Sequence, residues 1–374
     1  MIQTLTVLIY PLILIGIGIW RTKRVQTHAD FMVAGRSVPA WMLAGTLICT
    51  WVGSGTLFGG AGLAFRSGLS AMWFSVGAWV GLVAVYMMAS RVRALAQYTV
   101  PDILEKRYNP ASRFLGTVAI LIAYTAIAAY QFRGGGWILS IVTDGVISPT
   151  TGMLITAGVI VVFTAVSGMF SIVSVDVING VIITLSILIA LPILVFSNGG
   201  PSAIAEGLDP ELLTISGGHN VLWVIGVALP TFLFLFGESG MYQKFFSAKN
   251  ARAARRSVFG MLAGIMVIET CIALLGITGR SIVPQLATET SVVGRAASET
   301  VILYLARHSL PDVLGAALLA AAVAIVLSTG STMLLVASSN VTRDLYERFL
   351  RPKASDKDKL RVQRMAVVGL AIIG

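Results

Sequence analysis

The sequence predicts an all-α polytopic membrane protein, and composition is the first reason. Of the 374 residues, 56% are hydrophobic and 12% are charged, whereas a soluble chain typically has about 25% charged residues. A surface with half the usual charge suits lipid better than water. The composition therefore argues against a soluble enzyme, a nucleic-acid-binding protein and a disordered chain, despite a net charge of +10.

Long apolar runs are the second reason, because a helix needs about 20 mostly apolar residues to cross a bilayer. Nine such runs and the start of a tenth at Met365 predict nine complete spans and a partial one. The nine runs cover residues 2–20, 40–65, 69–90, 114–142, 151–166, 172–196, 221–240, 258–282 and 313–341. The first is too long for a signal peptide and lacks a cleavage site, so we expect it to be retained. The last is too short to cross, so we expect the sequence to belong to a longer protein.

Basic residues set the expected orientation, because cytoplasmic loops of membrane proteins are enriched in Lys and Arg. If the amino terminus lies outside the cell, most of the 27 Lys and Arg residues fall on inner segments. We therefore expect a multi-pass protein of the inner (plasma) membrane with its amino terminus outside. An amphipathic helix over residues 288–308 is expected on the outer face. The positive-inside rule also explains the net charge, so no nucleic acid is expected as a partner.

Carboxylates inside the apolar runs are the first candidates for function, because each costs about 2.5 kcal/mol or more at mid-membrane unless it is used or paired. Asp176 and Glu269 lie well inside their runs, and Glu238 lies near the inner end of its run. Such a group either belongs to a cation site or pairs with Arg or backbone groups between helices. The sequence favours the cation site for Asp176 and leaves both interpretations open for the other two.

The second run contains a predicted break. Gly53 and Gly55 interrupt it near its middle, between Cys49 and Thr56, and glycine has low helix propensity. An unwound turn at mid-membrane is tolerated only where protein or a water-filled cavity receives the freed backbone groups. Freed carbonyls are ligands that a small hard cation can use. The alternative is a Gly-rich face for close helix packing.

A cluster of hydroxyl groups stands in the ninth run, where Ser328, Thr329, Ser331 and Thr332 lie within five residues. Ser328 and Ser331 are three apart and share one helix face, and the two threonines share an adjacent one. These hydroxyls could replace part of the hydration shell of a sodium ion. Alternatively, they bond back to carbonyls of their own helix, which is common in membrane helices.

Histidine and cysteine positions give no sign of an enzyme. His28, His219 and His308 lie in predicted loops or at helix ends, without a nucleophile–base pair or metal-ligand spacing. Cys49 and Cys271 lie inside predicted spans, and we expect both to be small core residues. The sequence therefore predicts that the protein is not an enzyme.

Four segments together resemble the solute:sodium symporter family, and the resemblance extends over essentially the whole chain. They are the broken run at 41–68 and the segments 164–179, 237–256 and 327–346. The last is the most specific, because it joins the hydroxyl cluster to the stretch Ser338–Tyr346, which matches the cytoplasmic exit of the family's eighth core helix.

The resemblance implies a leucine-transporter-like helix bundle built from two inverted five-helix repeats. A single transmembrane transporter domain would cover residues 1–374, in three parts. These are an extra span and cytoplasmic loop at 1–37, a first repeat at 38–196 and an incomplete second repeat at 219–374. Inverted repeats of this kind place substrate and coupling ion near the bilayer midplane, where discontinuous helices meet.

The family's main sodium site uses carbonyls of the first core helix and a carbonyl plus hydroxyls of the eighth. On this sequence, those positions are the carbonyls of Cys49, Val52 and Ile325 and the side chains of Ser328 and Thr329. Backbone ligands tolerate a change of side chain, and both hydroxyls match the family pattern. The resemblance therefore implies sodium, and no other metal, at these five residues.

Some family members hold a second sodium ion with an Asp of the fifth core helix and three hydroxyls of the eighth. Here Asp176, Ser328, Ser331 and Thr332 keep those ligand types. The family's usual Gln three positions after the Asp is Asn179, which changes the hydrogen-bonding support of the carboxylate. The resemblance thus implies one sodium ion, or two if this second site is filled.

The substrate is the least determined part of the prediction. The proline-transporting branch has an Asp two residues after the first sodium-binding carbonyl, where this chain has Trp51, so proline is a less favoured substrate. The stretch from Trp51 to Gly55 is closer to the choline-transporting branch, and choline recognition needs an aromatic box. Candidates for aromatic contacts are Trp51, Trp73, Tyr130, Phe232 and Phe236, and those for polar contacts are Thr56, Gln131 and Glu238.

Together these observations predict a sodium-coupled secondary symporter that imports a small organic solute by alternating access. Its expected partners are the solute, sodium and the lipid bilayer. Two alternatives stay open. The chain could be the transporter-like sensor domain of a signalling protein, or it could couple uptake to protons through Asp176 or Glu269.

Overall fold

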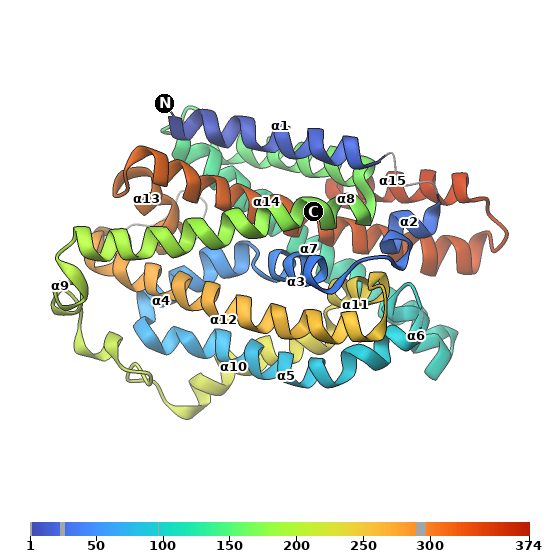
Figure 1. Ribbon diagram of the computed structural model, residues 1–374, viewed down its shortest axis with the longest axis horizontal. Coiled ribbons are helices and arrows are strands. Elements are labelled where there is room, and N and C mark those ends of the chain that lie inside the picture. Colours follow the sequence, from blue (N-terminus) through green and yellow to red (C-terminus); the bar gives the residue numbers. More distant parts are fainter. Residues whose placement is uncertain (1, 23–26, 96, 289–296) are drawn as a thin grey trace.

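The computed structural model describes residues 2–22, 27–95, 97–288 and 297–374, which form a bundle of helices lying mostly along one axis (Figure 1). No β-strand occurs in these four ranges. The all-α prediction is therefore confirmed for the part of the chain that is described.

The predicted runs correspond to helices. The long helices are α1 (Ile2–Thr22), α5 (Met72–Ala94), α7 (Pro110–Val142), α8 (Pro149–Ser197), α10 (Val221–Gly237), α12 (Ala251–Ile282), α14 (Asp312–Asn340) and α15 (Asp356–Ile373). Among the described residues, 6 helical stretches are long and apolar enough to cross a membrane, and two further apolar helices are shorter. The count of nine complete spans and a partial tenth stays a prediction.

A sharp kink divides α8 into the two runs predicted at 151–166 and 172–196. Gly168 lies at the kink with φ 66°, a conformation that side-chain-bearing residues rarely adopt. A Cβ at this position would lie 2.9 Å from Cδ2 of Phe31, which packs into the bend. The kink therefore requires glycine both for its backbone angle and for its space.

The predicted break in the second run is present. Helix α3 (Ala40–Trp51) ends at Val52, whose φ and ψ are −74° and 84°. The chain then continues as the π-helical turn η2 (Gly55–Gly60) and the short helix α4 (Ala61–Ser67). A straight helix through the glycines is thereby excluded.

A second break, which the sequence did not predict, ends α10. The residue that follows it, Glu238, has φ −72° and ψ 88°, nearly the angles of Val52 at the first break. Helix α11 (Ser239–Ser247) follows directly. Helices α3 and α10 are the first helices of the two expected repeats. An inverted repeat would produce a break with similar backbone angles in both of them.

Short helices connect the long ones. These are α2 (His28–Val33), η1 (Ala34–Arg36), η3 (Gly68–Ala71), α6 (Val100–Arg107), α9 (Gly200–Glu206), η4 (Pro210–Leu213), η5 (Pro284–Ala287), η6 (Ala297–Thr300), α13 (Val301–His308) and η7 (Val341–Leu350). The outer helix expected over residues 288–308 is described only in part. Thr288 caps η5, residues 289–296 lie outside the described part, and the helix α13 begins at Val301.

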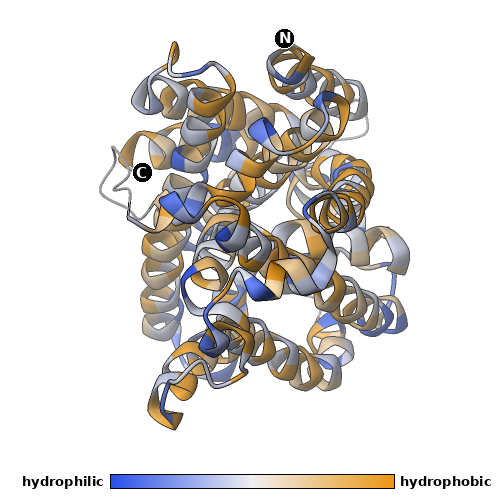
Figure 2. Cartoon of the chain, turned by 90° about the vertical axis from the view of Figure 1, so that its left-hand side faces the viewer, coloured by the Kyte–Doolittle hydropathy of each residue, from blue (hydrophilic) through white to orange (hydrophobic). Residues whose placement is uncertain are grey.

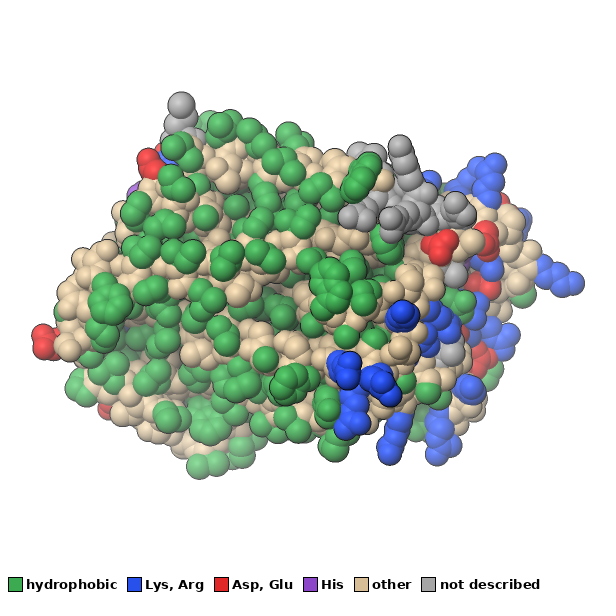
Figure 3. Space-filling model, in the orientation of Figure 1, with side chains coloured by type: hydrophobic (Ala, Val, Ile, Leu, Met, Phe, Trp, Pro, Cys, Tyr) green, Lys and Arg blue, Asp and Glu red, His purple; other side chains and the backbone are tan. Residues whose placement is uncertain are grey.

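Helix α14 is the centre of the bundle and packs most extensively against α8, α7 and α1. Its residues are almost all buried, whereas the outer helices expose large apolar side chains. Figure 2 shows hydrophobic residues along most helices, and Figure 3 shows an apolar flank with Lys and Arg gathered at the end where α2, α6 and α15 lie. An apolar flank with one basic end fits a protein that spans a membrane.

Candidate sodium and substrate site

The break in α3 frees backbone oxygens in the middle of the bundle. The amide N–H of Gly53 turns back to the carbonyl of Trp51 at 2.9 Å, and that of Thr56 donates to the carbonyl of Gly53 at 3.1 Å. The carbonyls of Cys49 and Val52 are therefore left outside the helical hydrogen-bond ladder.

Helix α14 brings Thr329 to these two carbonyls. Its hydroxyl oxygen lies 3.1 Å from the carbonyl oxygen of Cys49 and 3.5 Å from that of Val52. The approach needs Gly53, since a Cβ there would lie 3.0 Å from the Thr329 methyl group. The structure thus brings together three of the five residues predicted for the main sodium site.

The other two predicted ligands lie on the same helix. Ile325 is fully buried one turn before Thr329. The hydroxyl of Ser328 donates to Oδ1 of Asp176 at 2.5 Å. Sodium ligation by these five residues stays a prediction.

Asp176 of α8 is held by side chains from three other helices. Besides Ser328, the hydroxyl of Thr46 on α3 donates to its Oδ2. Lys244 of α11 places its ammonium nitrogen 3.5 Å from the same oxygen. Lys244 is not among the predicted site residues, because a basic residue near the inner end of a run is typical of a cytoplasmic segment.

The other two residues of the predicted second sodium site, Ser331 and Thr332, make no hydrogen bond to Asp176. Oγ1 of Thr332 lies 3.4 Å from Oγ1 of Thr50, on α3. Oγ of Ser331 is buried and has no hydrogen-bond partner among the described residues. Of the predicted quartet, the structure therefore joins only Asp176 and Ser328 directly.

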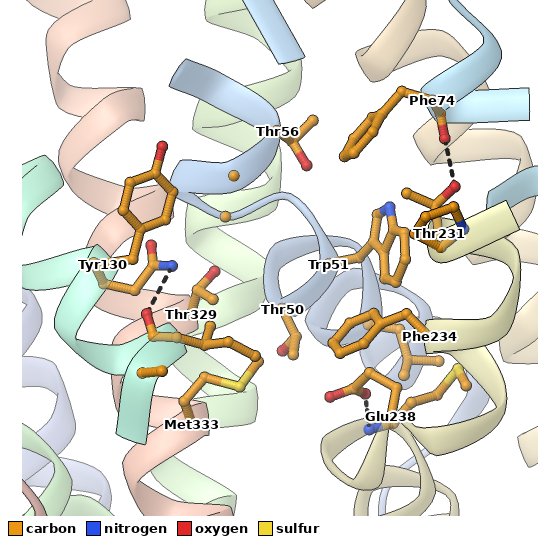
Figure 4. Close-up of a pocket in the computed structure, with 18 of the residues that line it drawn as sticks. Thr50, Trp51, Thr56, Phe74, Tyr130, Thr231, Phe234, Glu238, Thr329 and Met333 are labelled. Atoms are coloured by element: carbon orange, nitrogen blue, oxygen red, sulfur yellow. Dashed lines mark hydrogen bonds between the residues drawn. The ribbon is translucent and has the colours of Figure 1, made fainter. Parts of the chain in front are cut away.

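A cavity of about 510 Å³ opens beside the break (Figure 4). It is lined by five of the eight predicted substrate residues, namely Trp51, Thr56, Tyr130, Gln131 and Glu238. Thr329 of the sodium cluster also lines it. The candidate ion site and the candidate substrate site are therefore contiguous.

Helical periodicity explains why the other three predicted residues lie elsewhere. Phe232 and Phe236 pack edge to face on each other, with ring centroids 5.2 Å apart, and Phe234 between them faces the cavity instead. Trp73 donates to the carbonyl of Ile215, and the next residue along the chain, Phe74, faces the cavity. Phe234 could have been found from the sequence, because it lies four residues before Glu238 and so shares its helix face.

Glu238 is the one charged side chain among the described residues that line the cavity. It caps the N-terminus of α11 by accepting hydrogen bonds from the amides of Gly240 and Met241. The hydroxyl of Tyr124 donates to its Oε1. Its carboxylate therefore has a structural role at the second break as well as a place at the cavity.

Trp51 is fixed in the cavity wall by Glu269 of α12. The indole N–H groups of Trp51 and Trp79 donate to the two carboxylate oxygens of Glu269 at 2.8 and 2.7 Å. The ring of Trp51 in turn lies 5.9 Å from that of Phe234, centroid to centroid. Glu269 thus meets hydrogen-bond donors rather than an Arg or Lys partner.

Gln131 of α7 stabilises the chain at the break by binding Ser54. Its Oε1 accepts hydrogen bonds from the amide N–H of Ser54 at 3.0 Å and from the Ser54 hydroxyl at 2.7 Å. Both donors are buried, and no helical carbonyl is available to them at the broken turn.

We expect Gln131→Leu to destabilise the protein by about 1–3 kcal/mol, because two buried donors would lose their acceptor. The measurement is the thermal unfolding midpoint of the purified protein. Gln97→Leu, at an exposed hydrogen bond, serves as the matched control and should change little. A leucine variant as stable as the wild type would contradict the role given to Gln131.

Comparison with known proteins identifies the family. The model of the family described as "Sodium:solute symporter family" matches residues 31–374. The chain belongs to the sodium:solute symporter family. It is therefore a transporter rather than an enzyme, and a multi-pass protein of the plasma membrane with sodium as its coupling ion.

Curated relatives in the symporter family cover nearly the whole chain. The high-affinity proline transporter PutP of Bacillus subtilis (strain 168) is 28% identical over 374 residues, which is 96% of this chain and 76% of the relative. The sodium/proline symporter of Escherichia coli (strain K12) is 27% identical, over 100% of this chain and 76% of the relative.

A solved structure of a Na⁺-coupled sialic acid symporter, in a substrate-bound outward-open state, has the same fold. It superposes with a TM-score of 0.86 at 17% identity, over 100% of this chain and 79% of that one. The predicted leucine-transporter-like bundle is therefore supported by a symporter of known structure.

Proposed function

We propose that the protein imports a small organic solute together with sodium, and that sodium binds where the broken α3 meets α14. The observation that carries the proposal is the Thr329 hydroxyl at 3.1 and 3.5 Å from the freed carbonyls of Cys49 and Val52. Three oxygens from two helices converge there, beside the cavity. An ion bound between them would link the two repeats, and its release inward would let them separate. One charge crossing 100 mV contributes about 2.3 kcal/mol to this cycle.

The proposal includes an inverted-repeat architecture and an amino terminus outside the cell. The near-identical backbone angles at Val52 and Glu238 support the first. The second is supported by α1, which starts at the end of the molecule opposite to the basic one (Figures 1 and 3).

The cavity suits a solute with a positively charged nitrogen and an apolar body. Its aromatic walls, Trp51, Tyr130 and Phe234, can receive a cation on their ring faces. Glu238 supplies a negative charge, and no cationic side chain is found among the described lining residues to attract an anionic solute. Proline and choline both carry such a nitrogen. The names of the relatives favour proline, whereas Trp51 in place of the proline branch's Asp favours choline.

Uptake of radiolabelled proline and choline into proteoliposomes tests the proposal. We expect accumulation of at least one of them when sodium is highest outside, and none when potassium replaces sodium. Trp51→Asp should shift the preference toward proline if Trp51 selects against it. Uptake of either solute that persists without sodium and follows a pH gradient would contradict the sodium site and favour proton coupling.

A further inference from the structure

Lys244 is buried completely in the middle of the helix bundle. Its exposed fraction is 0%, and it lies in the last turn of α11, the helix that follows the second break. Lysine is almost never fully buried unless its charge is matched, because the ammonium group loses its hydration. What surrounds the ammonium therefore indicates what the residue does.

Three oxygens of different kinds surround the ammonium nitrogen. It donates to the carbonyl oxygen of Thr46 at 2.9 Å and to the hydroxyl of Thr50, and Oδ2 of Asp176 lies 3.5 Å away. An ammonium group has three N–H donors, so this set can use all of them. A carbonyl, a hydroxyl and a carboxylate are also the kinds of ligand that the family's sodium sites use.

The ammonium group shares one ligand, Asp176, with the second sodium site that the family resemblance implies. Asp176 is the one carboxylate of that site, and its other oxygen already accepts from Ser328 at 2.5 Å. Thr50, which accepts from the ammonium, lies 3.4 Å from Thr332, another member of the predicted quartet. A single negative charge thus faces a positive charge that the chain itself provides.

We propose that the ammonium group of Lys244 serves as the permanent cation of this second site, so that the protein binds one sodium ion, at Thr329, and not two. A sodium ion at Asp176 would place two positive charges beside one carboxylate in a dry environment, where repulsion is strong. The tethered cation keeps Asp176 neutralised and α3, α8 and α11 joined throughout the cycle. This inference rests on the proposed function, because it takes Thr329 as the main sodium site.

The test counts sodium ions directly and does not require the solute. Equilibrium binding of ²²Na⁺ to the purified chain in detergent gives the number of ions per protein at saturation. We expect one for the wild type and two for Lys244→Met, which removes the charge and releases Asp176. Lys244→Gln keeps a donor near the Thr46 carbonyl and gives the same test in a second variant, should the methionine variant fail to fold.

Matched variants separate the two sites. Lys244→Met with Asp176→Asn should return to one ion, and Lys249→Met, at an exposed lysine of the same segment, should stay at one. Lys244→Met with Thr329→Val should keep one ion, now at Asp176.

Each other result overturns a defined claim. Two ions bound by the wild type, or one ion bound by a folded Lys244→Met or Lys244→Gln variant, would overturn the role of Lys244. No sodium bound by the wild type would overturn the proposed function itself.

Discussion

Replacing Thr329 with valine is expected to raise the sodium concentration for half-maximal binding about tenfold or more. Valine keeps the shape of threonine but removes the oxygen that meets the carbonyls of Cys49 and Val52. An interaction with a charged group is worth about 1.5–3 kcal/mol, and 1.4 kcal/mol is a factor of ten. Titration of ²²Na⁺ binding gives the affinity, and sodium-driven uptake gives the functional counterpart.

A control on the same helix separates this effect from a general loss of polarity. The hydroxyl of Ser338, also fully buried on α14, bonds back to the carbonyl of Leu335 at 2.9 Å. Ser338→Ala should leave sodium affinity within about twofold of the wild type, since it disturbs only a local hydrogen bond. Equal sodium affinity in Thr329→Val and the wild type would remove Thr329 from the site.

The contact between Thr329 and the broken helix could be predicted only in part from the sequence. Gly53 and Gly55 indicate a break because glycine weakens a helix wherever it stands, and a cluster of hydroxyls is visible without coordinates. The helices themselves were predictable for a similar reason, because an apolar run must be helical to satisfy its backbone in lipid. That the two features converge required the family resemblance.

The second break was not predictable in this way. It occurs at Glu238, whose carboxylate caps the new helix α11. The flanking glycines, Gly237 and Gly240, stand at the end of the predicted run, where they indicate a boundary rather than a break within it. The contacts of Lys244 were not predictable either, because its partners Thr46 and Asp176 are distant in sequence and lie beside it only in the folded bundle. Phe232 and Phe236 are aromatic, as the prediction required, but they lie on a face of α10 that does not line the cavity.

At the basic end of the molecule, a buried ion network joins α6, the start of α7 and η7. The guanidinium group of Arg113, at the start of α7, lies 2.7 Å from Asp102, 2.6 Å from Glu105 and 2.6 Å from Asp344. Hydrogen bonds from Arg348 and then Arg113 hold the pKa of the Glu105 carboxyl below its usual range. The side chains of Asp102 and Asp344 are 4% and 0% exposed, so both carboxylates depend on protein groups rather than on water. Arg113 therefore connects α6, α7 and η7.

Arg113→Met is accordingly expected to destabilise the protein by about 3–5 kcal/mol, because the buried Asp344 would lose its cationic partner while Asp102 would keep only Arg343, at 3.5 Å. Arg348 provides the matched control. It also binds Glu105, at 2.6 Å, but its side chain is 46% exposed, so Arg348→Met should cost at most about 1 kcal/mol. Thermal unfolding of both purified variants measures the difference.

If the network also keeps the basic end of the bundle closed, Arg113→Met should make residue 50 more accessible from that end. The measurement is the labelling of a cysteine placed at Thr50 by a membrane-impermeant thiol reagent added from the cytoplasmic face. Equal stability and equal labelling in the two variants would mean that the buried carboxylates find other partners and that Arg113 neither holds this end together nor keeps it shut.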